Sequence, residues 1–248
     1  MKKDNRWKLV AGFGLLILSL ILYGIHYLIF QDAHHIFLYF IGDLAFIPVE
    51  VLIVTLIIDQ LLESREKQQR MEKLNMVIGT FFSEFGTPLL AVLSHADPGI
   101  NKIQKDLVIG NVWNDGQFRN VQANLASHTC SISGERFDRE DLRKLLVNHE
   151  QFILRLLENP MVFEHESFTD LILATSHLTE ELKARDDLNG LPLADLAHLN
   201  ADTVRVYERL APEWLKYMEY LRNHYPYLFS LAMRKNPFDT SASVVIRE

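Results

Sequence analysis

Two long apolar runs near the N-terminus constrain the fold of this 248-residue chain more than any other feature. Residues 9–30 contain no formally charged side chain, and residues 36–58 are apolar except at a few positions. About twenty helical residues, rising roughly 1.5 Å each, span the ~30 Å hydrocarbon core of a bilayer. Because only five residues connect the two runs, the sequence predicts a tight transmembrane helical hairpin that is retained as an anchor.

Basic residues are distributed unevenly around the two runs. Four precede the first run, four lie within residues 65–73 after the second run, and the connecting loop contains none. Lysine and arginine concentrate on the cytoplasmic side of membrane proteins. We therefore expect a protein of the inner (plasma) membrane, with both termini in the cytoplasm and the lipid bilayer as a partner.

The second run contains two carboxylates, Asp43 and Glu50, seven residues apart and so on one face of a helix. An ionised carboxylate near the bilayer centre costs at least ~2.5 kcal/mol, so such groups usually face a bundle interior, a partner or water. Pro48, between them, removes a backbone hydrogen bond and is a candidate hinge. Two interpretations remain open. The acids line a pore made by several copies, or Asp43 snorkels to the surface while Glu50 bonds to Ser19 or His26.

The remainder of the chain has helical patterning throughout. No proline or glycine interrupts residues 51–78, so the second span is predicted to continue as a helical stalk over residues 59–85. Gly86-Thr87-Pro88 is predicted to end that helix and begin another. Apolar residues at three- and four-residue steps predict a cytosolic helical bundle over residues 86–235, followed by an irregular tail at 236–248. The predicted fold class is all-α, since no segment alternates as a strand would.

Composition and motifs exclude several classes of function. The whole net charge of −7 belongs to residues 59–248, which argues against nucleic-acid binding. Walker A, dinucleotide-binding, hydrolase and zinc-protease motifs are all absent from the sequence. The single cysteine, Cys130, permits no intrachain disulfide and has no surrounding nucleophile motif. We expect a protein that is not an enzyme and needs no cofactor.

Two further features have competing interpretations. His198 shares a predicted helix face with Asp195 and Asp202, but metal-binding bundles repeat such sets on separate helices, often as Glu-x-x-His. We find no repeat of that motif and expect no metal site. The aromatic stretch at residues 212–239 is predicted to form core or a subunit interface rather than a ligand site. Pro212 and Pro226 are predicted to divide this part of the chain into short helices.

Residues 47–86 and 213–239 resemble segments of uncharacterised prokaryotic proteins that have a membrane hairpin and a cytosolic helical region. The resemblance implies the same two-part organisation over most of the chain. It implies no activity and no functional residues.

The leading hypothesis is a small homo-oligomeric channel that conducts cations. Asp43 and Glu50 would line its pore, and the bundle would assemble or gate it through the stalk. A two-span subunit cannot enclose a pore alone, so this hypothesis requires a homo-oligomer. The alternative is a membrane-anchored scaffold or sensor whose helical bundle binds a cytosolic partner. A metal-dependent enzyme in the bundle has the least support.

Overall fold

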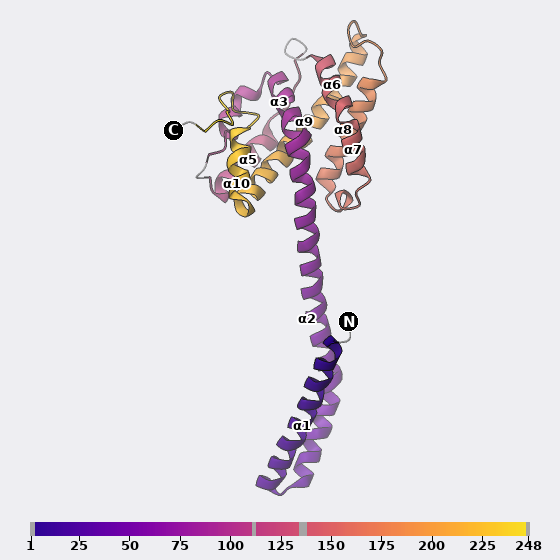
Figure 1. The fold of residues 1–248 in the computed structure, drawn as a ribbon, viewed down its shortest axis with the longest axis vertical. Coiled ribbons are helices and arrows are strands. Elements are labelled where there is room, and N and C mark those ends of the chain that lie inside the picture. Colours follow the sequence, from indigo (N-terminus) through magenta and orange to yellow (C-terminus); the bar gives the residue numbers. More distant parts are fainter. Residues whose placement is uncertain (1–2, 111–112, 134–137, 247–248) are drawn as a thin grey trace. The chain divides into compact units, whose positions relative to one another are not determined.

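The computed structural model describes residues 3–110, 113–133 and 138–246, and every regular element in these residues is a helix (Figure 1). The predicted all-α fold class is therefore confirmed. The chain forms two compact units, Met1–Lys67 and Gln68–Glu248, which we describe separately.

The first unit consists of α1 (Lys3–Phe30) and the first part of α2 (Ala33–Phe81). Between them the chain reverses at Gln31, which has a left-handed backbone (φ 52°). The backbone N–H of His35 donates to Oδ1 of Asp32, so Asp32 satisfies a free N–H group at the start of α2. Across the turn, the ring centres of His26 and His35 lie 6.1 Å apart.

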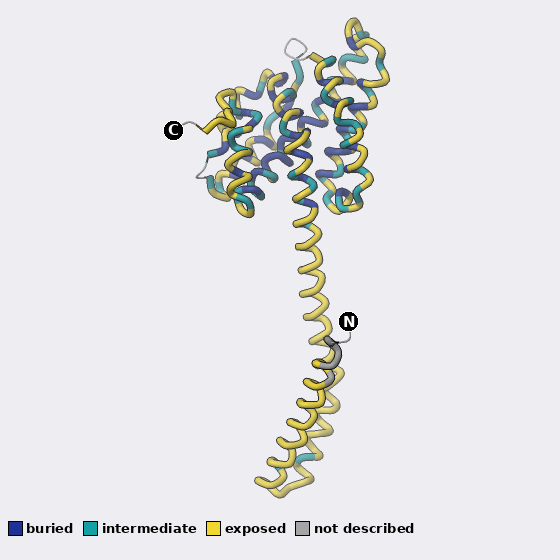
Figure 2. The backbone as a smooth tube through the Cα atoms, viewed as in Figure 1, coloured by how far each residue is buried: buried dark blue, intermediate teal, exposed yellow. Residues whose placement is uncertain are grey.

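Two segments, Val10–Phe30 and Ala33–Ala96, contain stretches that are apolar and long enough to cross a membrane, judged by length and composition alone. The core helix of a soluble protein passes the same test, but no residue of either apolar stretch is buried. Figure 2 shows this difference, because exposed residues make up nearly all of the first unit while buried residues gather in the second.

Near its C-terminal end, α2 packs into the second unit through Leu74, Ile78 and Phe81. It is followed without a break by a π-helical turn (Phe82–Gly86) and by α3 (Thr87–Ala96). The prediction that Gly86-Thr87-Pro88 ends one helix and starts another is wrong about the backbone, which stays helical. Pro88 cannot donate to the carbonyl four residues earlier, and the chain widens by one residue so that the Thr87 N–H donates to the Phe82 carbonyl.

Gly86 is required by the close packing of this turn. A Cβ atom on Gly86 would lie 2.5 Å from the ring of Phe81 and 2.8 Å from that of Phe82. Those two rings are fully buried and pack edge to face, 5.1 Å apart. Only glycine, which has no Cβ atom, therefore fits at this position.

The remaining helices complete the second unit. In chain order they are the 3₁₀ turn Ile100–Lys102, α4 (Gln104–Leu107), α5 (Asp115–Ser127), α6 (Arg139–Asn148), α7 (Glu150–Leu157), the 3₁₀ turn Val162–Glu164, α8 (Glu166–Lys183), α9 (Leu193–His224) and α10 (Pro226–Arg234). Asn114 forms a capping box at the start of α5, and Asp138 caps α6.

The core of the second unit is organised around α9, which packs against α3, α5, α8 and α10. Its buried face includes Tyr207, Leu210, Trp214 and Met218. Each fully buried large apolar side chain stabilises the fold by roughly 1.5–3 kcal/mol. Pro212 lies inside α9, so the predicted division at this proline is wrong; burial of the flanking residues outweighs the cost of the missing hydrogen bond.

Residues 236–246 of the C-terminal tail form no regular helix, and the first of them dock on the core. Phe238 is buried edge to face against Trp214, with ring centres 5.1 Å apart. The Nδ2 group of Asn236 donates to the Leu107 carbonyl over 2.8 Å. Residues 236–238 therefore belong to the folded unit.

Candidate functional site

The three sequence-predicted site residues, Asp43, Pro48 and Glu50, all lie in α2. Their side chains are exposed in the single chain. Pro48 lies within the helix without ending it. Among the residues that the structure describes, no hydrogen bond joins Glu50 to Ser19 or His26, and neither carboxylate has an ion-pair partner. Within one chain the two acids are therefore unpaired on one helix face.

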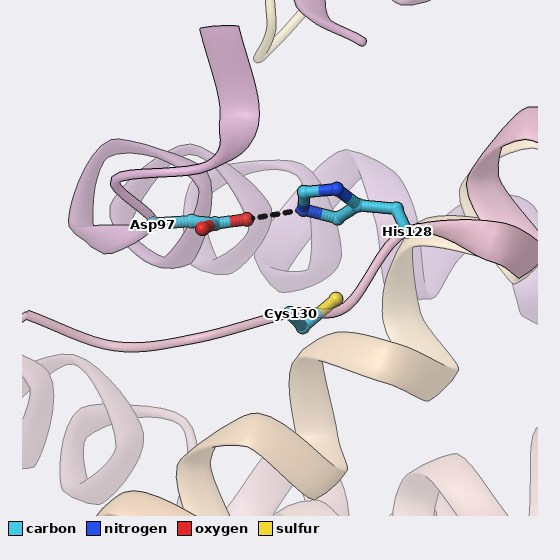
Figure 3. Close-up of side chains that lie close together, drawn as sticks. All are labelled: Asp97, His128 and Cys130. Atoms are coloured by element: carbon cyan, nitrogen blue, oxygen red, sulfur yellow. Dashed lines mark hydrogen bonds and ion pairs between the residues drawn. The ribbon is translucent and has the colours of Figure 1, made fainter. Parts of the chain in front are cut away.

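A second candidate site is a buried polar cluster of Asp97, His128 and Cys130 (Figure 3). Asp97 follows α3 directly, and the two other residues lie in the segment after α5. The Nε2 atom of His128 lies 2.6 Å from Oδ2 of Asp97, and both side chains are almost completely buried. One ligand atom from each of the three residues lies within 4.8 Å of the others.

The Asp97 carboxylate is satisfied by groups of its own surroundings. Its Oδ1 atom accepts from the Gly99 backbone N–H over 2.8 Å and from the Ser131 hydroxyl over 3.4 Å. Its Oδ2 atom lies within hydrogen-bond distance of Nε2 of His128. Both oxygens therefore have partners within the protein, which is the usual condition for a buried carboxylate.

The thiol of Cys130 is held in its unreactive form. Burial, followed by the nearby charges of Asp97 and Glu208, raises the pKa of this thiol from 9.0 to about 12. Only a thiolate acts as a nucleophile or a metal ligand, so neither role fits Cys130 at neutral pH. Burial likewise raises the pKa of the neighbouring Tyr207 phenol, with a further contribution from Asp97.

The donor set therefore fits a metal ion poorly, because the carboxylate and imidazole already bind each other and the thiol stays protonated. The contact between Asp97 and His128 instead holds the segment after α5 against the end of α3. No local sequence pattern indicates this contact, since Asp97 and His128 are 31 residues apart and belong to no common motif.

The third feature is a groove of about 1140 Å³ in the second unit, bounded by the end of α2, α3, α9, α10 and the tail. Three tyrosines of the aromatic stretch, Tyr217, Tyr220 and Tyr225, line it. The Tyr217 ring stacks on Phe82 with centres 5.0 Å apart. Part of the aromatic stretch is core, as predicted, but these tyrosines face a groove of the size that small-molecule sites have.

The structure thus defines an all-helical protein with two long apolar helices and a compact helical unit that contains a large groove. The comparisons with known proteins agree with this division. The chain belongs to the MJ1433 family: the model described as "MJ1433, N-terminal helical domain" matches residues 2–62, and that of "Uncharacterized protein MJ1433, C-terminal helical domain" matches residues 70–234.

One relative shares nearly the full length of the chain. The chain is 45% identical over 245 residues to the "Uncharacterized protein MJ1433" of Methanocaldococcus jannaschii, covering 99% of this chain and 98% of that protein. No solved structure matches the chain. The predicted resemblance to an uncharacterised family with two helical parts is confirmed, and this family name carries no activity.

Proposed function

We propose that this protein is a membrane-anchored sensor whose cytosolic helical unit binds an amphipathic small molecule. The observation that carries the proposal is the groove of about 1140 Å³ lined by Tyr217, Tyr220 and Tyr225. Its wall includes residues of α2, the helix that also contains the second apolar segment. The proposal includes no catalytic step and no nucleic-acid partner.

The lining of the groove indicates the chemistry of the ligand. Apolar side chains in its wall are exposed to solvent, among them Met76, Leu228 and Leu231. Covering them with an apolar ligand body would be favourable by about 25 cal/mol for each Å² removed from water. Arg234 and Lys235 line the groove together with Glu84 and Asp239, and the two basic side chains offer positive charge to an acidic group of the ligand. An aromatic or aliphatic body with one acidic group fits both features.

Membrane attachment is supported by the first unit. Its large apolar side chains are exposed along both helices, far beyond what a solvent-facing surface normally contains. A bilayer is the environment in which such a surface is stable, since its thickness matches about twenty helical residues. The basic residues that flank the two helices support the placement of both termini in the cytoplasm.

Binding of an acidic amphipathic fluorophore, 8-anilinonaphthalene-1-sulfonate, to the full chain in lipid nanodiscs tests the proposal. We expect saturable binding of one probe per chain above the signal of empty nanodiscs. Gly79→Phe should abolish it, because Gly79 lines the groove and a Cβ there lies 3.6 Å from the Tyr217 ring. Ala123→Phe, on the exposed face of α5, is the matched control and should bind normally. Equal binding by both variants would overturn the proposal.

One observation favours a second candidate, the homo-oligomeric cation channel. Asp43 and Glu50 are exposed and unpaired in the single chain, so inside a bilayer they need a partner or water. Several copies of the same helix, arranged around a symmetry axis, would provide partner side chains and enclose water. Liposomes containing the protein should then pass cations, and Glu50→Gln should reduce the flux. A folded oligomer that passes no cations would exclude this candidate.

A further inference from the structure

Two histidines and two carboxylates meet where α8 packs against α9, away from the groove and from the buried Asp97 cluster. His177 and Glu181 are four residues apart in α8, and His198 and Asp202 are four residues apart in α9. Residues at that spacing share a helix face. The two faces are turned toward each other, because both histidines approach the same carboxylate oxygen.

The histidine–carboxylate distances within this cluster approach those between the ligands of a metal site. Oδ2 of Asp202 lies 3.4 Å from Nε2 of His177 and 3.4 Å from Nε2 of His198. The two oxygens of Glu181 lie 3.9 Å and 3.6 Å from the same two nitrogens. Ligand atoms about 2.0–2.1 Å from a tetrahedral metal ion are separated by about 3.4 Å. The four ligand atoms do not all lie within 4.8 Å of one another, so the half-exposed imidazoles would move inward to bind one ion together with the carboxylates.

The burial of the Asp202 carboxylate also suits a cation ligand. The Asp202 side chain is only 2% exposed, and its Oδ2 atom accepts no hydrogen bond within the described part of the chain. Its other oxygen, Oδ1, accepts from Arg205. The nearest polar neighbours of this oxygen are the two imidazole Nε2 atoms, each 3.4 Å away. A metal ion bound by the imidazoles would also contact this oxygen.

Other charged groups hold the carboxylates in position. Arg185 donates to Oε2 of Glu181 over 2.8 Å and forms two hydrogen bonds with Asp195. Partners of this kind orient metal ligands in known sites.

We propose that His177, Glu181, His198 and Asp202 bind one divalent transition-metal ion, with Zn²⁺ the best match. Imidazole nitrogens and carboxylate oxygens are both ligands of Zn²⁺, which prefers four of them in tetrahedral geometry. The histidine side chains are 47% and 50% exposed, so an ion can enter from solvent. The bound ion would fasten α8 to α9 near their connecting loop.

This inference reverses the expectation that the chain has no metal site. His198 and Asp202 share a predicted helix face, but the chain contains no repeated Glu-x-x-His motif. The second half of the set is His177-x-x-x-Glu181, which has a different order and spacing. Only the antiparallel packing of α8 on α9 brings the two halves together.

Zinc titration of the full chain tests the proposal, using protein without a polyhistidine tag in nanodiscs after removal of metals by a chelator. We expect calorimetry to show one Zn²⁺ per chain. His177→Ala and His198→Ala should each weaken binding roughly tenfold or more, a loss of about 1.4 kcal/mol or more. His95→Ala, an exposed histidine of α3, should bind like the unaltered protein. Zinc should also raise the melting temperature of the unaltered protein but not of the two variants.

Cobalt substitution distinguishes this site from the buried cysteine cluster. We expect Co²⁺ to give the visible bands of a tetrahedral site without a thiolate charge-transfer band. A thiolate band would place the metal at Cys130 and overturn the proposal. Binding that does not saturate, or that survives in both histidine variants while their metal-free stability is unchanged, would also overturn it. The test is independent of the groove, so its failure leaves the proposed sensor function intact.

Discussion

At the residue scale, the contact between Asp97 and His128 is the clearest buried polar interaction of the helical unit. Removing one member leaves the other buried without its partner, which typically costs about 3–5 kcal/mol. We expect His128→Ala to lower the free energy of unfolding by about 3 kcal/mol, measured by chemical denaturation with Trp fluorescence. His95→Ala, at an exposed position, should change it by less than about 0.5 kcal/mol. Equal small effects would show that the buried contact contributes no stability.

Cys130 allows a prediction about pH at the same scale. Its pKa is 9.0 in an ordinary environment and about 12 in the folded protein. The folded state therefore retains a proton that the unfolded state loses between these values, so this group's contribution to stability falls as the pH rises from about 9 to 12. At pH 8 we expect iodoacetamide to modify native Cys130 at least about 100-fold more slowly than the unfolded chain. Similar rates in both states would contradict the raised pKa.

At the element scale, the π-helical turn after α2 depends on Gly86. An alanine Cβ there would overlap the buried Phe81 and Phe82 rings, and overpacking of this kind typically costs about 1–3 kcal/mol. We expect Gly86→Ala to lower the melting temperature by several degrees. Gly79→Ala is the matched control, because its Cβ makes an ordinary 3.6 Å contact and alanine favours a helix. A neutral Gly86→Ala variant would show that the turn can rearrange.

The helices also show which structural features can be predicted from the sequence and which cannot. Helix positions followed from apolar spacing and from capping residues such as Asp138, because these signals act within a few residues. Prolines were harder to interpret, because the backbone stays helical at both Pro88 and Pro212, whose neighbours Leu89 and Ala211 are buried in the core. The Asp97–His128 contact and the α8–α9 histidine cluster join separate helices. Their pairing depends on tertiary packing, which no local pattern specifies.

At the scale of the whole molecule, our account combines a membrane hairpin with a cytosolic helical unit that binds ligands. The hairpin part rests on exposed apolar helices and flanking basic residues, and the ligand part rests on the aromatic groove. The match of separate family models to residues 2–62 and 70–234 supports this division into two parts. The proposed sensor function depends on one central claim, that the hairpin crosses the membrane with the helical unit in the cytoplasm.

Cysteine accessibility in intact cells tests that claim most directly. Native Cys130 is 8% exposed, so it contributes little labelling of its own. Ala33→Cys places a thiol at the turn between α1 and α2, and Ala123→Cys places one on the exposed face of α5. With a membrane-impermeant maleimide, we predict labelling of Ala33→Cys in intact cells and of Ala123→Cys only after the cells are lysed. Labelling of Ala123→Cys in intact cells, or recovery of the protein in the soluble fraction, would contradict the account.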